Sequence, residues 1–163
     1  MHPIQLSVLV ARPPEEVFDY LADVANHPEF TDHYLTDWRL TREDSVGRGA
    51  GARFRIKAPL NRFDWADVTL AEVDRPRRIV QVGRAGKFNR IRMLSTYTLK
   101  PASGDQTRVE FEIDAQPALP TDRIVEAYTR PWLRRKANRG LKRLRSILEE
   151  DHGRGKRITV AAR

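Results

Sequence analysis

The stretch PTDRIVEAYTRPWLRRKANRGLKRLRSILEED, residues 120–151, predicts a long C-terminal helix on which the rest of the chain is organised. In its second half, apolar residues recur every three or four positions, which is the period of one helical face. A face of this kind is stable only when another layer covers it, so we expect the helix to pack against a sheet. The apolar row comprises Leu133, Ala137, Leu141, Leu144 and Leu148.

The opposite side of the same helix is basic. The chain has a formal net charge of +8, and residues 123–163 alone contain 13 Lys or Arg against 4 Asp or Glu. A one-sided positive field is compatible with nucleic acid or an anionic membrane, and also with a solvated helix face, which we favour. The basic surface is formed by Arg135, Lys136, Arg139, Lys142 and Arg143.

The first half of this helix carries a second apolar row, made of Ile124, Tyr128 and Trp132. On a helical wheel it is rotated by more than a quarter turn from the first row, and the change of phase falls at Pro131. Because a proline inside a helix removes one hydrogen bond and crowds the preceding turn, we expect a kink there, or a fresh start capped by Thr129.

Before this helix the sequence predicts mostly strands. Alternating apolar residues indicate a strand at 2–11, and two short helices follow in the segments PPEEVFDYLAD and HPEFTDHY. The alternation changes phase between Trp65 and Val68, which predicts a β-bulge. The fold class is α+β, with a curved seven-stranded antiparallel sheet, two short helices after strand 1 and a long helix over the sheet. The six further strands are expected at 35–41, 50–57, 63–73, 78–82, 90–99 and 108–115.

Four stretches carry a family resemblance: PPEEVFDYLADVANHPEFTDHYLTDW, GRGAGARFRI, EVDRPRRIVQ and TYTLKPASGDQTRVEFEI. Together they resemble the START-like (SRPBCC) superfamily, in particular its polyketide cyclase/dehydrase and lipid-transport branch, which is related to the Bet v 1 allergens. The resemblance implies a helix-grip fold, in which the curved sheet wraps around the C-terminal helix and encloses an apolar cavity. We expect one START-like domain at 1–152 and a basic C-terminal tail at 153–163.

The inward faces of the strands and the first half of the helix predict the lining of this cavity. Val80 and Val82 are also expected to face inward. An apolar cavity with a few polar groups is the usual composition of a small-molecule site, whereas a filled core with satisfied hydroxyls is the alternative. The predicted ligand-binding residues are Phe54, Ile56, Trp65, Gln81, Met93, Ser95, Tyr97, Phe111, Tyr128 and Trp132.

Other candidate chemistry is sparse. The chain has no cysteine, its four histidines lack zinc-ligand spacing, and no cofactor or metal is predicted. His27 and His33 are expected to be helix-cap and surface residues. Asp64 or Asp67 would be a candidate general acid or base only if the sheet turned it inward, where burial would raise its pKa. Catalytic residues therefore stay unassigned, and the sequence does not decide whether the protein is an enzyme.

The function that these observations favour is binding of a small hydrophobic or amphipathic ligand, such as a lipid, polyketide or aromatic metabolite. One alternative is a cyclase/dehydrase-type enzyme using Tyr97, Tyr128 or an inward Asp. Another is a protein whose basic helix docks on RNA, the ribosome or an anionic membrane, which we favour less. The tail is expected either to be disordered or to add to a sheet edge in a homodimer. A cytoplasmic location is expected.

Overall fold

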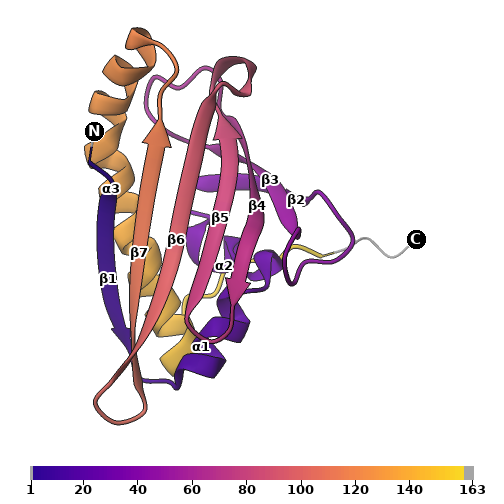
Figure 1. Cartoon of the computed structure of the whole chain (residues 1–163), viewed down its shortest axis with the longest axis vertical. Coiled ribbons are helices and arrows are strands. Elements are labelled where there is room, and N and C mark those ends of the chain that lie inside the picture. Colours follow the sequence, from indigo (N-terminus) through magenta and orange to yellow (C-terminus); the bar gives the residue numbers. More distant parts are fainter. Residues whose placement is uncertain (1, 160–163) are drawn as a thin grey trace.

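The computed structural model describes residues 2–159 and shows one antiparallel sheet of seven strands that curls around a long helix (Figure 1). The strand order is β1-β7-β6-β5-β4-β3-β2, so consecutive strands pair from β2 to β7, whereas β1 pairs with β7 and not with β2. The predicted α+β helix-grip fold is confirmed. The strands are β1 (Ile4–Val10), β2 (Leu35–Leu40), β3 (Gly51–Ile56), β4 (Trp65–Asp74), β5 (Arg78–Ala85), β6 (Ile91–Ala102) and β7 (Gln106–Gln116).

Helical segments connect the two edges of the sheet and cover its concave side. The first begins at tandem prolines and carries Glu15 and Glu16 in its first turn, where acidic residues interact favourably with the helix dipole. It buries Val17, Phe18 and Leu21 in the main core. The helical segments are α1 (Pro14–Leu21), the 3₁₀ turn η1 (Val24–Asn26), α2 (Pro28–Thr31), the 3₁₀ turn η2 (Lys87–Asn89) and α3 (Pro120–Glu150).

Helix α3 runs through Pro131 without a break, so the predicted fresh start at Thr129 is wrong. The Thr129 hydroxyl instead donates back to the carbonyl oxygens of Val125, at 2.9 Å, and Glu126, at 3.3 Å. An unbroken helix keeps one inward face along its whole length. In the second half of α3 this face is buried through Ala137, Gly140, Leu141, Leu144 and Ile147.

The continuity of α3 also changes which side chains of its first half face the cavity. Ile124 and Tyr128 were expected to face the cavity, but both are exposed. Because the phase does not change at Pro131, the inward positions are those that continue the second half backwards, including Val125 and Thr129.

The strands confirm most of the predicted alternation but place the irregularity of β4 elsewhere. The pairing of β3 with β4 is regular from Trp65 to Thr69, so no bulge lies between Trp65 and Val68. The register shifts against β5 instead, between Leu70 and Glu72. Without the expected bulge, Val68 faces inward, and Trp65 lies on the opposite side of the strand.

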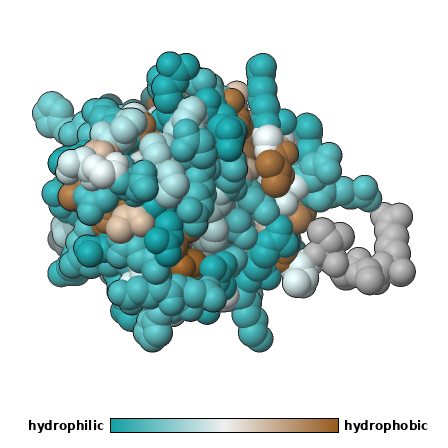
Figure 2. Space-filling model, turned by 90° about the horizontal axis from the view of Figure 1, so that it is seen from below, coloured by the Kyte–Doolittle hydropathy of each residue, from teal (hydrophilic) through white to brown (hydrophobic). Residues whose placement is uncertain are grey.

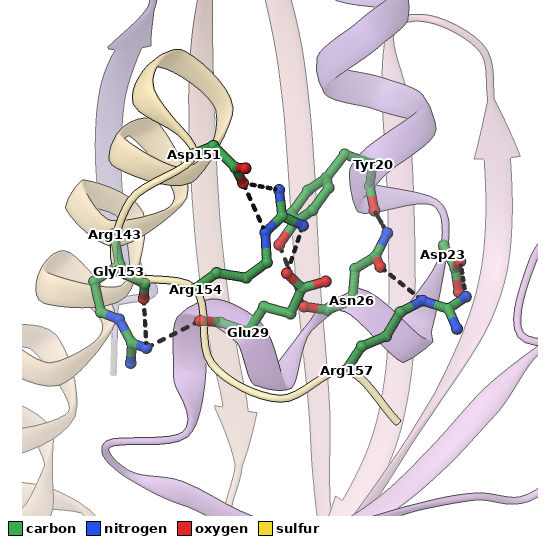
Figure 3. A network of polar contacts seen from close by, with 9 residues as sticks. All are labelled: Tyr20, Asp23, Asn26, Glu29, Arg143, Asp151, Gly153, Arg154 and Arg157. Carbon is green, nitrogen blue, oxygen red and sulfur yellow. Dashed lines mark hydrogen bonds and ion pairs between the residues drawn. The ribbon is translucent and has the colours of Figure 1, made fainter. Parts of the chain in front are cut away.

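The start of the tail packs on the domain rather than on a sheet edge, which differs from both expectations for it (Figure 3). Two backbone hydrogen bonds fix it: the Gly155 amide donates to the Glu29 carbonyl at 2.8 Å, and the Ile158 amide donates to the Ala25 carbonyl at 3.0 Å. The Arg154 guanidinium lies 2.6 Å from the Glu29 carboxylate. Residues 160–163 lie outside the described residues.

Two more arginines complete this network (Figure 3). Arg157 pairs with Asp23 at 2.6 Å. Arg143 was predicted to belong to the basic surface, but its guanidinium donates to Asp32, to the Glu29 carbonyl and to the Gly153 carbonyl. It therefore joins α3 to α2 and to the tail. The prediction failed because the helical wheel shows which side a cation occupies, but not that a second helix packs there.

Candidate functional site

A cavity of about 220 Å³ lies between the concave face of the sheet, the segment around α2 and the first half of α3. Its walls are mainly aromatic and aliphatic. The Tyr97 and Phe111 rings stack with centroids 4.4 Å apart, and the Trp38 and Phe54 rings lie at the same separation. Such rings supply a large apolar contact area with little rotational freedom. The aromatic side chains of the wall are Tyr34, Trp38, Phe54, Phe63, Tyr97, Phe111 and Trp132.

Eight of the ten residues predicted to bind ligand surround this one cavity, although their binding role stays a prediction. Trp65 and Tyr128 do not. The Trp65 ring is covered by the guanidinium groups of Arg53 and Arg55, at 4.9 and 5.2 Å, and Tyr128 points into solvent. The eight that line the cavity are Phe54, Ile56, Gln81, Met93, Ser95, Tyr97, Phe111 and Trp132.

Strand β5 shows one further correction. Val80 and Val82 were expected to face the cavity, but neither lines it, and Val82 is exposed. The inward positions are Gln81, Gly83 and Ala85. Two valines flanking a polar residue suggested an apolar face, whereas the period of two brings the polar residue inward.

A strip of hydrogen-bonded polar groups, which we call the polar strip, crosses the cavity wall. Ser95 Oγ donates to Gln81 Oε1 at 2.9 Å, and Gln81 Nε2 lies 3.5 Å from Nδ1 of His27. The other ring nitrogen of His27 donates to the Leu21 carbonyl at 2.8 Å. Burial lowers the pKa of His27, so its imidazole is neutral. The strip is therefore uncharged and directional.

His27 lies at a helix cap as expected, between η1 and α2, but its side chain is buried and not on the surface, so its place in the cavity wall was missed. The signal that was available is its spacing: Val24, His27 and Thr31 are three and four residues apart and share one side of the η1–α2 segment. Because a proline interrupts this short segment, the helical spacing of its buried residues was not evident. The Thr31 hydroxyl donates to the His27 carbonyl at 2.7 Å, which holds the segment against the sheet.

Two tyrosine hydroxyls are the remaining polar groups of the cavity wall. Tyr34 and Tyr97 are both buried, and burial raises the pKa of each phenol, so both are protonated. Within residues 2–159 neither hydroxyl has a hydrogen-bond partner. Neither hydroxyl oxygen is among the fully enclosed polar atoms that lack a partner, so both are accessible from the cavity, where a ligand with a carbonyl or hydroxyl group can bond to them.

Carboxylates near the cavity are neutralised by cations at its mouth. Asp122 accepts two hydrogen bonds from Arg90, at 2.6 and 3.0 Å, and these hold the pKa of Asp122 below its ordinary value. Glu126 lies 3.8 Å from Arg130. Asp64 pairs with Arg55, and Asp67, which is among the residues lining the cavity, accepts a hydrogen bond from the Arg84 amide at 3.0 Å.

Comparison with known proteins identifies the family and the fold. A family model described as polyketide cyclase/dehydrase and lipid transport matches residues 1–149. No curated protein matches the chain. In the part of the chain that is described, no helix combines the length and the apolar character needed to cross a bilayer.

Three solved structures share the fold at low sequence identity. The KanY protein has a TM-score of 0.72 at 19% identity, covering 90% of this chain and 97% of its own. Norcoclaurine synthase from Thalictrum flavum has a TM-score of 0.68 at 13% identity, covering 91% and 88%. DynU16, from the dynemicin biosynthetic locus, has a TM-score of 0.58 at 16% identity, covering 96% of this chain but 49% of its own.

Proposed function

The chain belongs to the polyketide cyclase/dehydrase and lipid transport family, and we propose that it binds a small, neutral hydrophobic ligand in the cavity beneath α3. The observation that carries this proposal is an aromatic cavity whose wall contains Tyr34 and Tyr97, with hydroxyls that make no hydrogen bond within residues 2–159. A packed core normally satisfies such groups itself. Here they are available to a bound molecule.

The volume limits the size of the ligand. An engineered apolar cavity of roughly 150 Å³ accommodates benzene, and pockets for drug-sized molecules begin near 300 Å³. At about 220 Å³ this cavity accommodates one or two aromatic rings, or a short acyl chain. A larger lipid or a polycyclic polyketide would leave part of its surface outside the mouth.

The polar groups limit the chemistry of the ligand. The polar strip and the two tyrosines are uncharged, and the nearby carboxylates are paired with arginine. Burying an ionised group here would cost free energy that no opposite charge offsets. The preferred ligand therefore carries a carbonyl or hydroxyl group on an apolar skeleton.

The test is a pair of tryptophan substitutions on adjacent residues of β7. Ala115 lines the cavity, whereas Gln116 is exposed on the next position of the strand. Native mass spectrometry would first detect a co-purifying molecule, and titration with naphthol-type compounds would then measure affinity. We expect Ala115→Trp to abolish binding and Gln116→Trp to retain it. Equal binding by both variants, or no binding by the wild type, would contradict the proposal.

A second candidate function is catalysis on such a ligand, because the polar strip contains a buried neutral imidazole. His27 Nδ1 carries a lone pair that faces Gln81 and the cavity, so it can accept a proton from an acidic C–H group of a poly-carbonyl chain. The Tyr97 hydroxyl can donate to the enolate oxygen that forms. Single-turnover assays with a poly-carbonyl substrate would test this, and unchanged turnover in His27→Gln and Tyr97→Phe would refute it.

A further inference from the structure

Most of the exposed large apolar side chains gather at one end of the molecule. The segments 57–64, 86–92 and 117–130, which we call the rim, lie together at the upper end in Figure 1, where β3, β5 and β7 end. Phe63 and Val125 belong to the rim and also line the cavity, so the cavity opens there. The exposed apolar side chains of the rim are Leu60, Phe63, Phe88, Leu119, Ile124, Val125 and Tyr128.

The opposite end of the molecule is different. Figure 2 shows it from below, and its surface is mostly hydrophilic. Scattered single apolar residues are normal on protein surfaces, whereas a cluster at one end marks an interaction site. The exposed apolar side chains therefore cluster at the same end of the molecule as the mouth of the cavity.

Backbone strain supports a role for the two most exposed of these side chains. Leu60 is 88% exposed and Phe88 is 85% exposed, and both adopt left-handed backbone angles, with φ of 61° and 58°. Bulky residues are unfavourable in that region, where glycine or asparagine is preferred. Leucine and phenylalanine are thus the wrong choices for folding at these positions, which points to a requirement outside the folded core.

The rim is also cationic. Its three segments contain seven Lys or Arg side chains and three carboxylates. Lys87 Nζ lies 5.7 Å from the Phe63 ring and 5.2 Å from the Phe88 ring. Arg62, Lys87 and Arg123 are exposed, and none of the ion pairs found in residues 2–159 involves them. Apolar tips interleaved with unpaired cations are the composition of surfaces that bind anionic bilayers.

We propose that the rim docks on the surface of an anionic bilayer, with the mouth of the cavity facing the lipid. Leu60, Phe63 and Phe88 enter the interface between headgroups and acyl chains, and Lys87 contacts the phosphates. A hydrophobic ligand then passes between bilayer and cavity without crossing water. Docking itself needs no ligand, so it can be tested whether or not the cavity binds one.

The test is sedimentation of the full-length protein with vesicles of phosphatidylcholine, either pure or containing a third phosphatidylglycerol. We expect binding to the anionic vesicles only, with the affinity falling as salt is raised. The double variant Leu60→Asn and Phe88→Asn should bind at least about tenfold more weakly, because each substitution removes an apolar side chain that the bilayer buries on docking. Lys87→Glu should weaken binding about 25-fold, because it changes the charge by two and each unit charge near an anionic surface contributes roughly fivefold.

Matched controls lie at the other end of the sheet. Leu9 is an exposed apolar residue near the end of β1, and Arg108 is an exposed cation at the start of β7. Leu9→Ser and Arg108→Glu should bind as the wild type does. Equal binding by rim and control variants, or equal binding to pure phosphatidylcholine, would overturn the proposal. Self-association that Leu60→Asn abolishes, without vesicle binding, would also overturn it and make the rim a contact between copies.

Discussion

Replacing Arg154 with alanine removes the cation that faces the buried carboxylate of Glu29. The two groups are 2.6 Å apart, and the Glu29 side chain is only 2% exposed. Removing one partner of a fully buried ion pair costs about 3–5 kcal/mol, because the remaining charge stays buried without compensation. The Arg154 side chain is 43% exposed, so water partly replaces it, and we expect Arg154→Ala to lower the free energy of unfolding by about 2 kcal/mol.

The assay is urea unfolding of four proteins in a double-mutant cycle: wild type, Arg154→Ala, Glu29→Gln and the double variant. Because Glu29→Gln removes the charge that needs compensation, Arg154→Ala should cost much less in that background. The control is Lys100→Ala, which breaks an exposed pair with Glu110 at 3.0 Å and should cost about 0.5 kcal/mol or less. If Arg154→Ala lowered the free energy of unfolding no more than Lys100→Ala does, or equally in both backgrounds, the ion pair between Arg154 and Glu29 would not stabilise the contact of the tail with α2.

Three further predictions concern the polar strip and the rim. Because burial holds the pKa of His27 below its ordinary 6.5, its contribution to stability is present above that pH and lost as pH falls through the lowered value. The free energy of unfolding should therefore fall as the pH is lowered from about 7 to 5, and it should fall less steeply in His27→Gln than in the wild type. A residual slope is expected from His33, because burial also lowers the pKa of His33. Equal slopes in the two proteins would contradict this. Gln81→Leu should lower the free energy of unfolding by about 1–3 kcal/mol in urea, because it leaves the side chains of Ser95 and His27 without their shared hydrogen-bond partner. A stability equal to that of the wild type would contradict this. Phe88→Gly should raise stability by about 1 kcal/mol in thermal unfolding, because glycine relieves the left-handed strain, and a loss of stability would mean that the phenyl ring packs on the fold.

The alternation of strand residues was sufficient to predict the sheet, because each inward row faces a buried side and each outward row faces water. It placed Met93, Ser95 and Tyr97 correctly on one face of β6. Trp65 was misplaced because a short irregular pattern was attributed to a bulge, and the pairing partners that decide the register are distant in sequence.

The helical errors have a related cause. Pro131 was expected to mark a kink or a fresh start, and the fresh start is wrong, because one missing hydrogen bond costs less than separating the long apolar row of α3 from the sheet. The cap position of His27 was predicted, but its burial was missed, because its polar partners Gln81 and the Leu21 carbonyl appear only in the folded chain. Positions decided by local period were predictable, whereas those decided by tertiary partners were not.

The uneven burial of α3 makes the first turns of this helix the part of the cavity wall that can open. The second half is anchored by Ala137, Leu141, Leu144 and Ile147, whereas most side chains from Thr121 to Tyr128 are exposed. Local opening requires least free energy where few apolar contacts are lost. The first turns of α3 can thus move away by breaking the Asp122–Arg90 ion pair, while the second half and every strand pairing stay intact. In the proposed function, exchange of ligand is therefore decoupled from global stability, and a very stable variant of this protein would still load and unload quickly.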